Sequence, residues 1–98
     1  RLPDAALVTA WSRHAGVGAE HLSLQLVGVD AQQGRPYDAI AWLSLPTVWS
    51  DDAVDRLQLG LARALAEGLD AAPDRVMVTT SMIASGRVVE GGEIVHFE

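Results

Sequence analysis

Side chains able to do acid–base, nucleophilic or metal chemistry are few in this sequence. All seven basic residues are arginine, lysine is absent, and there is no cysteine. The sequence therefore excludes Schiff-base lysine chemistry, a Walker-type phosphate loop, thiolate zinc sites and a cysteine nucleophile. The three histidines lack metal-ligand spacing and no HExxH motif accompanies them, so no metal site is predicted.

Two residues have side chains whose type suits a substrate site. Arg1 could hold a carboxylate through two hydrogen bonds, the alternative being a solvated terminal charge. His21 opens an alternating segment and could transfer or orient a proton. Trp42 and Trp49 flank a predicted strand-to-helix junction, where they pack in a core or interface or, alternatively, line a pocket.

Length and charge narrow the class of protein. The chain has 98 residues, enough for one small domain, and 49% are apolar, enough for a packed core. Its net charge of −6 argues against a nucleic-acid partner, which needs basic residues to displace counterions. No run approaches the ~20 apolar residues that cross a bilayer, and no signal-peptide pattern is found. We therefore predict no membrane partner and a cytoplasmic location.

Apolar periodicity predicts two helices and several strands. The clearest helix spans residues 52–69, where leucines recur on one face. An earlier helix is expected to start at Pro3 and to end at Gly16. The predicted strands cover residues 21–26, 39–45, 75–80 and 94–97.

The chain also repeats itself. Residues 18–24 match residues 72–78 in type, and each segment follows a helix and opens a strand. The second unit, residues 39–98, is a complete strand–helix–strand. The first unit, residues 1–38, begins at its helix, so its opening strand is expected to precede Arg1.

These units predict one α/β domain over residues 1–98. It contains two βαβ units related by a pseudo-twofold axis, with two helices on one face of a mainly parallel sheet. Residues 21–29 are expected to pair antiparallel with residues 75–82 across that axis.

Three stretches resemble the tautomerase superfamily, whose members include 4-oxalocrotonate tautomerase and macrophage migration inhibitory factor. Residues 72–76 (APDRV) are similar to the helix-to-strand turn of the inhibitory-factor branch. Residues 86–93 (GRVVEGGE) are similar to the glycine-rich hairpin that closes the bacterial tautomerase subunit. Arg1, before a Pro-Asp helix start, resembles the arginine that follows the first strand of the bacterial enzymes.

The resemblance implies a barrel-like homotrimer that acts without a cofactor on a small-molecule carbonyl acid. The usual catalyst of the family is an N-terminal proline, whose amine moves a proton between the carbon and oxygen of a keto–enol system. Position 1 is arginine here, so this proline is expected upstream of Arg1. The alternative is a non-catalytic oligomeric or ligand-binding relative, and a ferredoxin-like regulatory module is a more distant third.

The resemblance also implies a pocket between subunits. Its lining on this sequence would be Arg1, Val17, His21 and Pro46, with Met77 and Thr79 from a neighbour. The strand arginine of the small bacterial enzymes falls at Met77, so one of the family's two cations is missing. Such a pocket suits a small planar enolisable acid better than a dicarboxylate, which would need a second arginine.

Overall fold

The computed structural model describes residues 6–97, so Arg1 and the helix start expected at Pro3 lie outside the described residues. The elements are α1 (Ala6–Ala15), a 3-10 turn η1 (Ala19–His21), β1 (Ala39–Pro46), α2 (Asp51–Gly68), a second 3-10 turn η2 (Pro73–Arg75), β2 (Val76–Ile83), β3 (Val88–Glu90) and β4 (Glu93–Val95).

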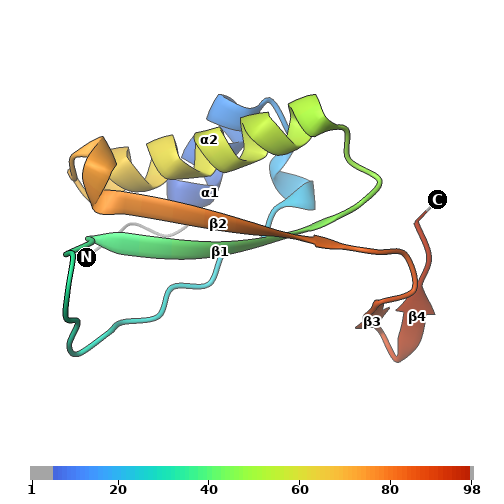
Figure 1. Cartoon of the computed structure of the whole chain (residues 1–98). Helices are drawn as coiled ribbons and strands as arrows, with labels where there is room; N and C mark the ends of the chain where they lie inside the picture. The colour runs from blue at the N-terminus through green and yellow to red at the C-terminus, as the bar shows by residue number, and fades with distance from the viewer. Residues whose placement is uncertain (1–5, 98) are drawn as a thin grey trace.

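The strands β1 and β2 form a parallel pair that runs from Ala39 opposite Val76 to Pro46 opposite Ile83. The crossover helix α2 lies on one face of this pair, and α1 packs beside α2 on the same side (Figure 1). The strands β3 and β4 form a separate antiparallel hairpin beyond the carboxyl end of β2 (Figure 1). The predicted two helices on one face of a mainly parallel sheet are therefore confirmed.

The helix α2 begins and packs as its sequence predicts. The Ser50 hydroxyl oxygen accepts a hydrogen bond from the Ala53 N–H at 3.2 Å, which satisfies one free donor of the first turn. Asp51 and Asp52 follow, where carboxylates favour the positive end of the helix dipole. The buried side of α2 contains Ala53, Leu57, Gly60, Leu61, Ala64 and Leu65.

The core lies where α1 crosses α2 above the sheet. Leu57 is completely buried, and the Trp11 indole N–H donates to the Leu57 carbonyl at 2.9 Å. A Cβ at Gly60 would lie only 3.0 Å from the Ala15 backbone nitrogen. The close approach of the two helices therefore depends on a glycine at this position.

The predicted strand over 21–26 is wrong, as is its antiparallel pairing with residues 75–82. Residues 22–29 form no strand, and β2 pairs with β1 instead. Leu22 and Leu24 still pack against the core, which explains the alternation seen in the sequence. A strand also needs a backbone partner, and no described strand pairs with this segment. The last strand is shorter than predicted, ending at Val95, and β3 precedes it.

None of the helices in residues 6–97 is long and apolar enough to cross a membrane.

Replacing Leu57 tests this account of the core. Leu57→Ala should lower the free energy of unfolding by about 2–5 kcal/mol, since the lost contacts leave a cavity between α1, α2 and the sheet. Val48→Ala, at a position 60% exposed, should change the free energy by less than about 0.5 kcal/mol. Urea unfolding followed by far-UV circular dichroism measures both variants. Equal decreases in the free energy of unfolding of the two variants would show that the core does not lie at Leu57.

Candidate functional site

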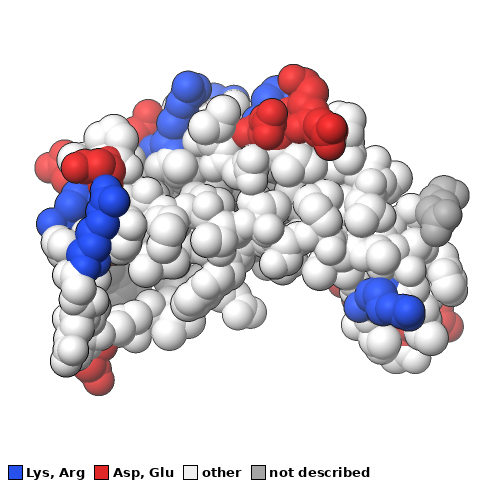
Figure 2. Space-filling model, viewed as in Figure 1, with Lys and Arg blue, Asp and Glu red and all other residues white. Residues whose placement is uncertain are grey.

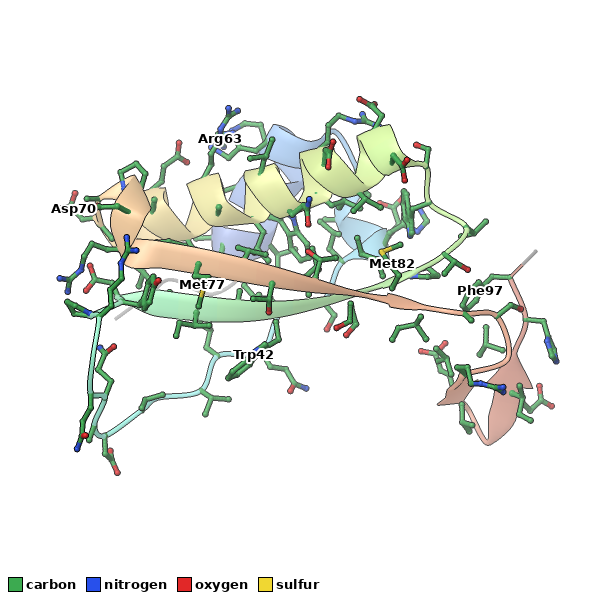
Figure 3. All side chains as sticks on the ribbon, viewed as in Figure 1. Trp42, Arg63, Asp70, Met77, Met82 and Phe97 are labelled. Carbon is green, nitrogen blue, oxygen red and sulfur yellow. The ribbon has the colours of Figure 1, made fainter. Side chains whose placement is uncertain are left out.

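The sheet face that points away from the helices carries an almost fully exposed tryptophan. The valines on either side of Met77 pack against the core, so strand alternation turns Met77 and Thr79 to the open face. The register sets Ile40 opposite Met77 and Trp42 opposite Thr79. Ile40 is 42% and Trp42 83% exposed, and Trp42 points away from the helices (Figure 3). These four residues are the open-face patch below.

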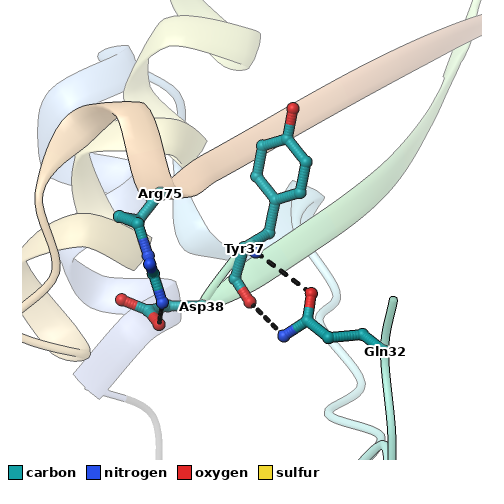
Figure 4. Close-up of polar contacts among 4 residues, drawn as sticks. All are labelled: Gln32, Tyr37, Asp38 and Arg75. Carbon is teal, nitrogen blue, oxygen red and sulfur yellow. Dashed lines mark hydrogen bonds and ion pairs between the residues drawn. The ribbon is translucent and has the colours of Figure 1, made fainter. Parts of the chain in front are cut away.

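An ion pair lies at the amino ends of the two strands, next to the open-face patch. The Arg75 Nη2–H donates to Asp38 Oδ1 at 2.8 Å, and the Asp38 backbone N–H donates to the Arg75 carbonyl at 2.7 Å (Figure 4). The hydrogen bond to Asp38, reinforced by the charge of that carboxylate, raises the pKa of Arg75 above its usual value. The pair therefore ties the segment before β1 to the start of β2.

The Gln32 side chain bridges the loop before β1 by bonding to the Tyr37 backbone. The Gln32 amide donates to the Tyr37 carbonyl at 2.8 Å and accepts from the Tyr37 N–H at 3.0 Å (Figure 4). The Arg35 guanidinium lies 5.5 Å from the centre of the Tyr37 ring, a cation–π distance. A cation and a phenol are thus held at the amino ends of the strands, where an anionic ligand could be attracted.

The residues predicted from sequence to line a pocket lie in different parts of a single copy. Met77 and Thr79 are on the open face. Val17 is buried in the core, and its carbonyl accepts from the Ser12 hydroxyl at 2.6 Å. His21 ends η1 with an exposed ring 3.9 Å from the Glu20 carboxylate, and Pro46 ends β1 at the opposite end of the sheet from Arg75. One copy does not bring them together.

A hollow of about 260 Å³ lies between α2 and β2, and sequence reasoning missed it. Its lining is Gln58, Leu59, Ala62 and Val78, none of which was a predicted site residue. The Gln58 carbonyl oxygen accepts from the Thr80 hydroxyl at 2.5 Å, and its amide donates to Asp55 at 3.2 Å. These two bonds occupy the Gln58 side-chain amide, and the other lining residues, Leu59, Ala62 and Val78, have apolar side chains. We call this feature the α2–β2 hollow.

Among residues 6–97, no group of three or more His, Cys, Asp or Glu side chains is placed to hold a metal ion. A group of three ionisable side chains joins the two helices. His14 Nε2 lies 2.9 Å from Glu67 Oε1, and Arg13 Nη2 lies 3.6 Å from the same oxygen. The hydrogen bond with His14 is the main cause that lowers the pKa of Glu67 below its usual value; desolvation opposes this shift, and nearby positive charges assist it. The grouping is therefore a helix–helix contact.

Comparison with known proteins gives a clear result only for structure. The sequence matches no model of a known protein family and no curated protein sequence. The fold is similar to the crystal structure of native fused 4-OT, with a TM-score of 0.68 and 19% identity over 92% of this chain and 80% of that one. The R7 fused 4-OT asymmetric trimer gives a TM-score of 0.70 and 20% identity over 91% of this chain and 78% of that one.

A third similar structure is N1, a member of the cis-3-chloroacrylic acid dehalogenase family. Its TM-score is 0.61 and its identity 16%, over 93% of this chain and 69% of that one. All three proteins belong to the tautomerase superfamily. The chain therefore has the tautomerase fold that its sequence motifs predicted.

The lowered pKa of Glu67 predicts how the stability of the fold depends on pH. Because this pKa is lower in the folded than in the unfolded chain, the stabilisation is present above about pH 4.5 and is lost as the pH falls through the folded value. Wild type should therefore be more stable than Glu67→Gln at about pH 7, and the difference should be smaller at about pH 3. Urea unfolding at both pH values measures it. A difference that stayed constant between them would contradict the pairing.

Proposed function

We propose that this protein is a cofactor-free tautomerase or isomerase that moves a proton within a small enolisable carbonyl acid. The observation that carries the proposal is the fold, shared over 91–93% of the chain with fused 4-OT and N1. The open-face patch adds a surface of the right character, since it is apolar with one hydroxyl, from Thr79. Such a surface suits a small planar acid better than a highly charged substrate.

In the proposed reaction, a secondary amine takes the enol O–H proton and returns a proton to the adjacent carbon, which gives the keto form. The amine belongs to a proline that we place upstream of Arg1. Apolar surroundings disfavour the charged amine, so its pKa falls toward neutrality and it can both accept and donate a proton. Arg1 holds the substrate carboxylate through charge-assisted hydrogen bonds.

A homotrimer would gather the remaining site residues. In a single copy Met77 and Thr79 are separated from Val17 and His21, so the proposed pocket forms between copies, with the open-face patch of one meeting the region after α1 of another. The exposed Trp42 and Ile40 supply apolar area for this contact. One of the similar proteins, R7 fused 4-OT, is an asymmetric trimer.

A second candidate function is non-catalytic binding in an oligomer of the same fold. One observation favours it: the open-face patch contains no acid or base, only Ile40, Trp42, Met77 and Thr79. The two functions differ in whether a ligand that binds is also converted.

Conversion of an enol acid tests the catalytic proposal. The protein, expressed with any residues that precede Arg1 in its gene, should accelerate ketonisation of phenylenolpyruvate, measured by the loss of enol absorbance in the ultraviolet. Intact mass spectrometry of the same sample should show an N-terminal peptide beginning with proline. A rate equal to that of buffer would reject the catalytic proposal and favour the non-catalytic one.

Arg1→Ala tests the proposed carboxylate contact. Loss of hydrogen bonds to a charged group removes roughly 1.5–3 kcal/mol of transition-state binding. The variant should therefore lower kcat/KM for phenylenolpyruvate about ten- to a hundredfold and leave the assembly unchanged. Arg87→Ala, which removes an exposed arginine near the hairpin, is the matched control. Unchanged activity in Arg1→Ala would remove Arg1 from the site.

Trp42→Glu tests the proposed assembly through the open face. A carboxylate in the middle of the apolar contact should disperse the homotrimer to the mass of one copy, 10.4 kDa for residues 1–98. Val48→Glu, at another exposed apolar position, should leave the mass unchanged. Light scattering with size-exclusion chromatography measures both. A Trp42→Glu protein that remains trimeric would show that this face is not the contact.

A further inference from the structure

The loop before β1 holds Arg35 in a fixed place. The Gln32 side-chain amide bonds to both the N–H and the carbonyl of Tyr37, as a neighbouring strand would, and so closes the loop on itself. Gly34 supplies a turn with a φ of +84°, a conformation that residues with a Cβ rarely adopt. Arg35 lies between Gly34 and Tyr37, so the loop presents its side chain from a preorganised backbone.

The Arg35 guanidinium is positioned by a ring and keeps its hydrogen-bond donors. It lies 5.5 Å from the centre of the Tyr37 ring, and this cation–π contact uses no hydrogen-bond acceptor. Within residues 6–97 the guanidinium forms no ion pair, and the residue is exposed. An arginine held in this way is suited to bind a charged oxygen through its N–H fork.

A second arginine, Arg75, lies at the same end of the sheet. Consecutive residues contact the two arginines: Tyr37 contacts Arg35, and the Asp38 carboxylate accepts from the Arg75 Nη2–H at 2.8 Å. The Arg75 side chain remains 40% exposed. Its Nε–H is buried and has no acceptor among the described residues, which is unfavourable because a buried donor has lost its bond to water. A ligand oxygen beside the guanidinium would supply the missing acceptor.

The charge around Arg75 favours a ligand with more than one negative charge. Figure 2 shows arginine and carboxylate side chains together at the end of the molecule where Figure 1 places the amino ends of β1 and β2, while the middle of this face carries no charge. Asp38 already pairs with Arg75, and the charge of Asp74 acts on it as well. A singly charged anion therefore gains little here, whereas a phosphate dianion offers several acceptor oxygens to two arginines.

We propose that Arg35 and Arg75 together bind a phosphate group at the amino ends of β1 and β2. The tetrahedral oxygens of phosphate accept from two guanidiniums with separate anchors, whereas a planar carboxylate matches the fork of a single arginine. Asp38 positions Arg75 and at the same time repels the ligand. The site goes beyond the proposed function, since it uses neither Arg1 nor an acid–base group. The phosphate group is either the free ion or an ester of a small molecule.

Two aromatic residues that each occur once allow the proposal to be tested by NMR. Tyr37 is the one tyrosine and Phe97 the one phenylalanine of the chain, and Phe97 lies at the opposite end of the molecule (Figure 3). Both rings are labelled with carbon-13, and inorganic phosphate is added at constant ionic strength and about pH 7.5, where it is mostly a dianion. The Tyr37 resonances should shift along a saturating curve and those of Phe97 should stay in place. Acetate should bind about tenfold more weakly or less.

Variants at the ion pair separate binding from structural support. Arg35→Gln and Arg75→Gln should each raise the Kd for phosphate about tenfold or more, because each removes charge-assisted hydrogen bonds. Asp38→Asn also breaks the ion pair, but it should lower the Kd about threefold or more, since it removes a competing acceptor and a like charge. Arg63→Gln, at an exposed position on α2, is the matched control. It should change the Kd by less than about twofold, because salt screens distant exposed charges.

Methyl phosphate distinguishes the two sources of the ligand. A monoester that binds as tightly as inorganic phosphate would support a phosphorylated small molecule, and binding of inorganic phosphate alone would support the free ion. No shift of Tyr37 up to about 50 mM phosphate, or equal affinity for acetate, would overturn the proposal. Weaker binding in both Arg75→Gln and Asp38→Asn would also overturn it, because the ion pair would then act only as structural support. None of these outcomes depends on catalysis, so they leave the proposed function to its own test.

Discussion

The β1–β2 pair is covered by helices on one face only, and the other features depend on this constraint. The covered face places Leu43 and Leu45 against α1 and α2, which makes the core. Alternation then necessarily turns Ile40 and Trp42 outward, because the same strand cannot bury both sets of side chains under one layer of helices. An apolar strand face left in water is unfavourable, which supports the proposed contact between copies through this face.

The helix layer owes its position to two contacts between α1 and α2. The Trp11 indole bonds to the Leu57 carbonyl, and Gly60 lets the backbone of Ala15 approach closely. These contacts fix the end of α1, and with it the turn that carries Val17 into the core. The His14–Glu67 bond adds a polar link at the far end of α2. The sheet therefore rests on this pair of helices, and no other described strand pairs with its two outer edges.

Sequence reasoning succeeded where a pattern is local and failed where it depends on a neighbour. The leucine stripe and the Ser50 cap predict α2 nearly to the residue, and a strand–helix–strand order requires a parallel pair. Alternation at residues 22–26 correctly placed Leu22 and Leu24 inward but could not supply a strand partner. The α2–β2 hollow depends on which side of α2 packs against β2, and the spacing of residues in the sequence does not reveal that side. The outward position of Trp42 was also hidden from sequence reasoning, because in this part of β1 the small Ala39 and Ala41 face the core and the larger Ile40 and Trp42 face outward.

The chain contains two methionines, and they allow the central claim to be tested directly. Met77 lies on the open face beside the proposed site, whereas Met82 is further along β2 and 44% exposed. Methyl NMR of protein labelled at methionine with carbon-13, titrated with phenylpyruvate, should shift the Met77 resonance and leave that of Met82 in place. A shift of Met82 alone, or of neither resonance at saturating acid, would contradict a carbonyl-acid site on this face of the sheet.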